Sequence, residues 1–109
     1  MYEVHFQPHA KRDLKWYKRK AKDRYRVILE RLDELEKDPR NESIELTDQE
    51  FHGLRRLKAG IDRVRLMICE DCRRDPTNHP IHLQRCSDCD DIPENGIKVF
   101  QITPRRKGY

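Results

Sequence analysis

Two basic, strand-like segments contain residues suited to act on a phosphate group. They span residues 57–66 and 99–109, and both combine arginine or lysine with apolar residues. Side chains alternate between the two faces of a strand, so such a segment can gather its cations on one face. Clustered cations stabilise the negative charge that develops on a reacting phosphate. The two segments therefore predict a phosphate-binding site.

The period of two assigns faces to the side chains around the first segment. The apolar Leu57, Val64 and Leu66 are expected to point to one face of a sheet. Four cations at alternating positions of two successive strands are expected on the other face: Arg56, Lys58, Arg63 and Arg65. If helices cover the apolar face, these cations form a basic open surface.

The cysteines form a second group of residues suited to a chemical role, here the binding of a metal ion. Two CxxC pairs are separated by thirteen residues: Cys69, Cys72, Cys86 and Cys89. Two such pairs complete a tetrahedral Zn²⁺ site, which has no open position for water and is therefore expected to be structural. The cysteines begin where one expected strand ends and stop shortly before Ile97. They predict a zinc-ribbon-like insertion over residues 69–96, in a β-hairpin of a single domain spanning 1–109.

Two alternatives to this zinc site remain open. The cysteines could form two disulfides, although a cytoplasmic location disfavours them. The sequence favours that location, because residues 1–8 lack a hydrophobic leader and no apolar run has the length of a membrane span. His79 and His82 lie between the cysteine pairs and could replace a cysteine as a ligand.

Composition and charge favour a polyanionic ligand. Charged residues make up 40% of the 109 residues and hydrophobic residues 35%, which allows one small core. Residues 1–31 carry ten basic and four acidic groups, and residues 97–109 carry four basic and no acidic groups, within a net charge of +4. Such basic blocks are typical of polyanion-binding surfaces, and a solvated charged surface is the alternative.

Hydrophobic periodicity predicts the elements that position these groups. Alternation over residues 2–6 predicts a strand, and apolar residues at helical spacing over 9–21 and 23–38 predict a helical hairpin. After an acidic connection over 41–50, with a short extended piece at 44–46, the period returns to two. The sequence thus predicts an α+β fold: an N-terminal strand, a helical hairpin on the apolar face, and then an antiparallel sheet.

This order of elements and two stretches of sequence resemble the RelE/ParE superfamily of toxins of type II toxin–antitoxin systems. Residues 53–64 read GLRRLKAGIDRV and resemble the family's basic-leucine-basic strand, glycine turn and following arginine. Residues 102–109 read ITPRRKGY and resemble its closing isoleucine, arginine and tyrosine. The resemblance covers nearly all of the chain except 69–96. It implies a RelE-like fold and, in the RelE branch, metal-independent cleavage of messenger RNA on the ribosome by attack of the 2′-hydroxyl.

Carried over by position, the resemblance implies five catalytic residues: Arg56, Lys58, Arg63, Arg105 and Tyr109. Arg63 and Arg105 would hold the phosphate, with Arg105 a candidate proton donor. Arg56 and Lys58 would stabilise charge, and Tyr109 would orient the nucleotide or transfer a proton. Three further cations are expected to contact RNA: Arg65, Arg106 and Lys107.

Some positions differ from the family pattern. Many members have a histidine beside the last arginine, where this chain has Pro104 and Arg106. The turn that often reads Gly-Asp-Tyr-Arg is Gly60-Ile61-Asp62-Arg63 here. His52 is a candidate source of an imidazole, and a structural role in the turn is the alternative.

Two other functions remain open beside the endoribonuclease. One is a ParE-like toxin that inhibits DNA gyrase, and the other is an inactive module that binds RNA or protein. The density of cations favours the nuclease, because ParE-type chains lack the full cluster. For an active toxin, the implied partners are a cognate antitoxin that covers the basic surface, messenger RNA and the ribosome, and no membrane.

Overall fold

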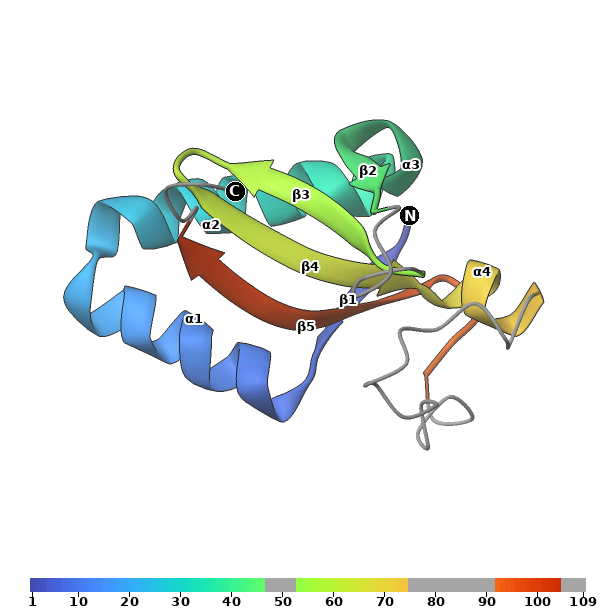
Figure 1. Cartoon of the computed structure of the whole chain (residues 1–109), viewed down its shortest axis with the longest axis horizontal. Coiled ribbons are helices and arrows are strands. Elements are labelled where there is room, and N and C mark those ends of the chain that lie inside the picture. Colours follow the sequence, from blue (N-terminus) through green and yellow to red (C-terminus); the bar gives the residue numbers. More distant parts are fainter. Residues whose placement is uncertain (47–52, 75–91, 105–109) are drawn as a thin grey trace.

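A computed structural model of the chain describes residues 1–46, 53–74 and 92–104 (Figure 1). The described strands form one five-stranded sheet in the order β1-β5-β4-β3-β2. The strands are β1 (Glu3–Phe6), β2 (Ser43–Glu45), β3 (Arg55–Ala59), β4 (Asp62–Ile68) and β5 (Gly96–Pro104). The expected α+β class is confirmed.

The sheet is mixed, so the prediction of an antiparallel sheet was wrong for one of its pairings. β1 runs parallel to β5, whereas β2, β3, β4 and β5 pair antiparallel in succession. Parallel neighbours need a long crossover connection, and here everything from the helical hairpin to β4 lies between β1 and β5 in the chain. Alternation of side chains along β1 indicates a half-buried strand but carries no information about the direction of its neighbour.

Two helices cover one face of the sheet. α1 (Pro8–Lys20) packs along β5, and α2 (Lys22–Lys37) passes behind β3 and β4 in Figure 1. Their ends agree with the expected helices to within one residue. Pro8 fits the first turn of α1, where a backbone N–H has no intrahelical acceptor. α2 ends because Asp38 precedes a proline, and the single turn α3 (Pro39–Glu42) follows it.

The core lies between the helices and the sheet. Tyr17, Ile28 and Leu35 supply its helical side. The strands supply apolar side chains on the facing side: Leu57, Ala59, Val64, Leu66, Ile68, Ile97, Val99 and Ile102. Among the described residues, no helix is long and apolar enough to cross a membrane.

A β-bulge allows β5 to contribute along its whole length to this core. The register between β4 and β5 shifts between Arg65 and Leu66, which leaves Phe100 without an opposite residue on β4. Val99 and Ile102 are three residues apart, so strict alternation would place them on opposite faces. The extra residue brings both into the core and leaves Phe100 in a second apolar cluster with Leu46, Leu54 and Met67.

The expected insertion begins with a short helix that the sequence did not predict. β4 ends at Ile68, and α4 (Cys69–Arg74) follows directly. Tyr2 donates a hydrogen bond to Glu70, and Arg40 donates one of 2.8 Å to Asp71, so α4 is fastened to the N-terminal part of the chain. The part of the expected insertion over 75–91 lies outside the described residues.

Candidate phosphate-binding site

The face of the sheet opposite the helices carries four cations in two directly opposed pairs. Arg56 on β3 lies opposite Arg65 on β4, and Lys58 lies opposite Arg63. Opposed residues on antiparallel strands have Cβ atoms about 5 Å apart, and like charges there are destabilising. The expected basic face is therefore confirmed for these four residues, and an anion bound between them would relieve their repulsion.

Two of the four cations are anchored. Arg63 is half-buried, and its Nη1 donates to the backbone oxygens of Gly60 at 3.1 Å and Asp62 at 2.8 Å. Arg65 is also half-buried, and its Nη1 donates to Oε1 of Gln101 on β5 at 2.8 Å. Anchored guanidinium groups lose little further conformational freedom on meeting a phosphate.

The other two cations extend into solvent. Arg56 and Lys58 are exposed, and neither forms an ion pair or side-chain hydrogen bond with the described part of the chain. Their donors remain available to an incoming phosphate. The site thus combines fixed cations at the turn end of β4 with adaptable cations on β3.

The other expected site residues lie beyond the described part of the sheet. β5 ends at Pro104, which is paired with Asp62, so the described strand stops beside Arg63 and one residue before Arg105. The remaining expected residues are also outside the described ranges: Arg106, Lys107, Tyr109 and His52. Their roles stay predictions.

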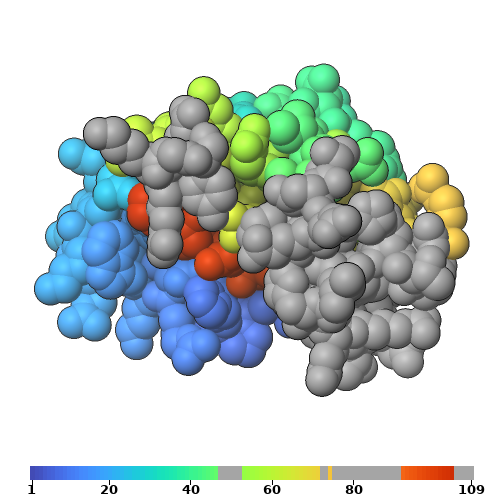
Figure 2. All heavy atoms as spheres, in the orientation of Figure 1, coloured from blue at the N-terminus to red at the C-terminus, as the bar shows by residue number. Residues whose placement is uncertain are grey.

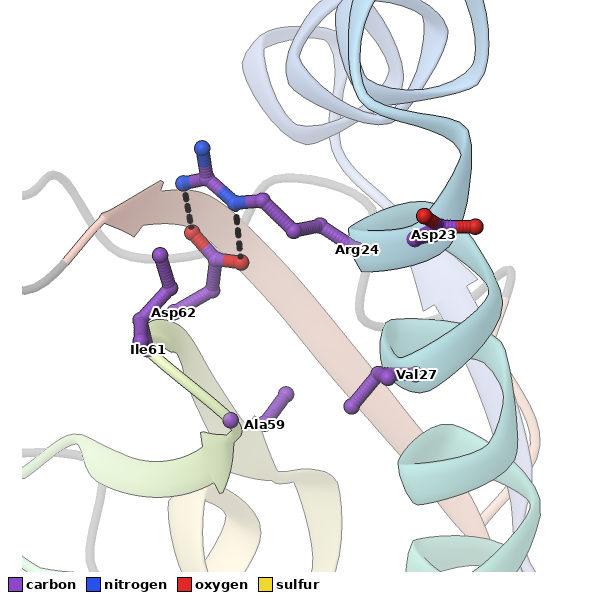
Figure 3. A pocket seen from close by; sticks show the side chains of 7 residues that line it. Asp23, Arg24, Val27, Ala59, Ile61 and Asp62 are labelled. Carbon is purple, nitrogen blue, oxygen red and sulfur yellow. Dashed lines mark hydrogen bonds and ion pairs between the residues drawn. The ribbon is translucent and has the colours of Figure 1, made fainter.

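A buried carboxylate fixes the turn from which Arg63 projects (Figure 3). Asp62 is fully buried and accepts hydrogen bonds from Tyr17 Oη at 2.7 Å and from Arg24 Nη2 and Nε at 2.6 and 3.0 Å. The Arg24 guanidinium also lies 5.2 Å from the centre of the Tyr17 ring. Both partners belong to the helical hairpin, so this network ties the start of β4 to the layer behind the sheet.

The surroundings of Tyr17 and Arg24 raise the pKa of both side chains. Burial raises the pKa of Tyr17 well above its usual value, and the hydrogen bond to Asp62 raises it further. The same carboxylate raises the pKa of Arg24 by accepting its hydrogen bonds. Tyr17 thus stays neutral and Arg24 stays charged, as expected for a structural element.

From the sequence, Asp62 was noted only as part of a departure from the family turn, and its partners were not predicted. A signal was present, because Asp62 is in phase with Val64 and Leu66 on the buried face, where a carboxylate needs hydrogen-bond donors. A shallow hollow of about 140 Å³ adjoins the network between Val27 and Ile61 (Figure 3). Arg24 and Asp62 line this hollow but are bound to each other, so we assign it no ligand.

The sequence also did not predict a buried lysine on the face of the sheet opposite the helices. Lys98 is 1% exposed, lies opposite Met67 on β4, and is paired in register with His5 on β1. Its only sequence signal is a lysine between the apolar Ile97 and Val99. Lys98 is located farther along the sheet than the four opposed cations.

The structure describes only the beginning of the cysteine group. Cys69 is 2% exposed, and a Cβ added at Gly96 would lie 3.5 Å from its Sγ, which places the thiol at the neck between β4 and β5. Cys72 lies three residues later in α4. The other expected ligands are outside the described residues: Cys86 and Cys89, and with them His79 and His82. The four-thiolate zinc site stays a prediction.

The comparisons with known proteins concern the fold. No protein-family model matches the sequence, and no curated protein matches it. Two structures of the YoeB–YefM complex from Staphylococcus aureus are similar to this chain, and one of them is described as a heterotetrameric toxin–antitoxin complex. Each matches with a TM-score of 0.59 and 16% sequence identity, over 94% of this chain and 95% of the matched chain. An archaeal RelE–RelB complex from Pyrococcus horikoshii OT3 matches with a TM-score of 0.56 and 21% identity over 98% of both chains. The chain therefore has the fold of the YoeB and RelE toxins.

Proposed function

We propose that this chain is the toxin of a toxin–antitoxin system and that it cleaves messenger RNA without a catalytic metal. The observation that carries the proposal is the pair of opposed cation pairs on the open face of a RelE-like sheet. A surface with this repulsion is expected to serve a polyanion. The chains with the same fold were solved in complexes with YefM and RelB, which supports an antitoxin as the protein partner.

The proposed reaction transfers a phosphoryl group within the RNA. The ribose 2′-oxygen forms a bond to the adjacent phosphorus while the bond from phosphorus to the 5′-oxygen of the next nucleotide breaks. The products are a 2′,3′-cyclic phosphate and a 5′-hydroxyl, with one proton leaving the 2′-hydroxyl and one reaching the leaving oxygen. Arg63 and Arg65 would hold the phosphate from fixed positions, while Arg56 and Lys58 would neutralise charge in the transition state.

The groups that would transfer protons are predicted from the sequence alone. Arg105 is the candidate donor to the leaving oxygen, and Tyr109 the candidate for nucleotide orientation or proton transfer. Arg106 and Lys107 would add contacts to the RNA backbone. The ribosome is the expected setting of cleavage, because the resemblance to the RelE branch implies it.

Purified, antitoxin-free protein is expected to cleave RNA in magnesium-free buffer. Cations of the chain, not a metal ion, would stabilise the phosphorane, so removing magnesium should leave the rate unchanged. The measurement is end-group analysis of the fragments, which should carry 2′,3′-cyclic phosphate and 5′-hydroxyl ends. Inhibition of gyrase supercoiling without RNA cleavage would favour the ParE-like alternative. If the protein showed neither gyrase inhibition nor cleavage of RNA, whether free or on translating ribosomes, the inactive binding module would be favoured.

We also propose that Cys69, Cys72, Cys86 and Cys89 hold one structural Zn²⁺ per chain. Replacing Cys72 by serine is expected to lower the melting temperature more than it lowers cleavage by the folded fraction, because a saturated thiolate site stabilises the fold without touching substrate. Elemental analysis should give one zinc per wild-type chain. Ser87→Ala, inside the second CxxC pair, is the matched control and should retain the metal.

Disulfide-linked sulfurs or a wild-type chain without zinc would contradict the metal site. A folded Cys72→Ser protein that bound no zinc and cleaved no RNA would instead place the insertion in the active surface.

A further inference from the structure

The outer surface of α1 is strongly basic and is separate from the open face of the sheet. Six of the thirteen residues of α1 are basic, and all six side chains are exposed: Lys11, Arg12, Lys15, Lys18, Arg19 and Lys20. Figure 2 shows the atoms of this helix along the lower left margin of the molecule. α1 belongs to the layer that packs behind the sheet, so the phosphate site described above does not include these residues.

No acidic group of the described chain neutralises this surface. None of the six cations forms an ion pair with a described residue. Asp13 is the only carboxylate of α1, and its Oδ2 is engaged by His9 Nδ1 at 2.9 Å and by the backbone N–H of Ile102 at 3.0 Å. The repulsion among the cations is therefore uncompensated within the described residues.

Helical spacing concentrates this charge in a stripe. Lys15 has Lys11 and Arg19 as neighbours at i±4, and Arg12 and Lys18 as neighbours at i±3. Like charges at these spacings destabilise a helix by a few tenths of a kcal/mol per pair. The cations in the last turn gain from the helix dipole, but Lys11, Arg12 and Lys15 have no such compensation. The sequence thus keeps a stripe about 12 Å long basic, although the repulsion lowers the stability of the helix.

An exposed aromatic ring lies at the border of the stripe. Trp16 is 51% exposed and packs edge-on against Tyr17, with ring centroids 5.1 Å apart and an interplanar angle of 89°. Because Tyr17 is fixed by Asp62, the indole rests on a rigid support. Cations beside a supported, solvent-facing ring match the needs of RNA, since phosphates pair with cations and unpaired bases stack on aromatic faces.

We infer that the outer face of α1 is a second RNA-binding surface, which contacts the backbone of a structured RNA and stacks Trp16 on an unpaired base. This inference extends the proposed function, because the RNA bound by α1 is separate from the strand that is cleaved. Binding at α1 does not require cleavage. An acidic polypeptide is the competing ligand. It would satisfy the cations but would leave the exposed indole without a stacking partner.

Trp16 is the only tryptophan of the chain, so its fluorescence reports on this surface. The full-length protein is titrated with an uncleavable 2′-O-methyl RNA stem–loop. Saturable quenching is expected, with an affinity that falls steeply with salt as counterions are released. Two results would overturn the inference. One is the absence of binding. The other is an unchanged Trp16 fluorescence at saturating RNA, when anisotropy of a labelled stem–loop shows that the RNA is bound.

A matched pair of variants separates this surface from general charge. Lys15→Glu and Lys37→Glu each lower the net charge by two at an exposed helical lysine. Lys15→Glu is expected to weaken binding at least about tenfold and to lower the magnitude of the salt slope by at least about one, and Lys37→Glu less than twofold. Lys15→Arg should bind within twofold of wild type. Equal losses from the two glutamate variants would contradict a localised site.

Two further measurements exclude misfolding and a protein ligand. Lys15→Glu removes like-charge contacts within α1, so its melting temperature should equal or exceed that of wild type while binding falls. Poly-L-glutamate at the same concentration of charge should bind more weakly than the stem–loop. Equal or tighter binding of polyglutamate would contradict RNA as the ligand and would indicate an acidic protein partner.

The outcome is independent of the cleavage proposal. Lys15→Glu is expected to cleave a short single-stranded oligonucleotide at the wild-type rate, whereas Arg56→Ala/Lys58→Ala should lose that cleavage and keep the Trp16 signal. Loss of the Trp16 signal in the Arg56→Ala/Lys58→Ala variant would mean that both surfaces form one site and would overturn the inference.

Discussion

Replacing Arg63 by alanine should reduce RNA cleavage by on the order of a hundredfold. Arg63 is the cation that the backbone of the β3–β4 turn fixes most directly, so its loss removes charge stabilisation that is already in position before the substrate arrives. Arg105→Ala, predicted from sequence alone, should have a similar effect. The measurement is the single-turnover cleavage rate, together with growth arrest when the variant is expressed.

The fold should survive the Arg63 substitution. The variant loses hydrogen bonds to two backbone oxygens but also loses the repulsion between Arg63 and Lys58, so its free energy of unfolding should change by less than about 1 kcal/mol. Arg26→Ala is the control, because the side chain of this exposed arginine on α2 forms no hydrogen bond or ion pair within the described residues. Full toxicity of an Arg63→Ala/Arg105→Ala protein would sink the nuclease proposal.

The second large effect concerns stability. Arg24→Ala is expected to lower the free energy of unfolding by about 2–3 kcal/mol, because it leaves the buried Asp62 carboxylate without its bidentate partner. The Arg24 side chain is 33% exposed, so the loss should fall below that of a fully buried pair. Urea denaturation measures it, and the melting temperature should drop by roughly 10 °C.

A double variant tests the physical cause of that loss. Arg24→Ala/Asp62→Asn removes the unpaired charge along with its partner and should be more stable than Arg24→Ala alone. Arg26→Ala, two residues away on the same helix, should stay within about 0.5 kcal/mol of wild type. If Arg24→Ala were as mild as Arg26→Ala, the network could not be what fastens the turn.

The order of elements and the basic face could be predicted because both depend on periodicity. The helical stripe containing Tyr17 and Ile28, and the alternation from Arg63 to Leu66, determine which side chains can be buried together. The same alternation placed Arg56 and Lys58 beside Arg63 and Arg65 before any pairing was known. Local sequence is sufficient for such statements.

The features that escaped prediction depend on partners distant in the chain. The direction of β1 is set by β5, and the bulge at Phe100 is visible only in the register with β4. Asp62 could be recognised as structural only once Tyr17 and Arg24 were known to reach it. The helix α4 was not predicted, because Cys69 and Cys72 were interpreted only by their CxxC spacing, and the metal site that this spacing predicts stays a prediction.

The position of β5 also bears on when the protein can become active during its synthesis. β5 is the last described strand to leave the ribosome, yet it lies inside the sheet between β1 and β4. Until residues 96–101 of β5 have emerged, β1 has no neighbour and Arg65 lacks its partner Gln101, however early the helical hairpin forms. A growing chain therefore carries the cations of the site without the scaffold that aligns them, which would delay any attack on RNA until translation of the sheet is finished.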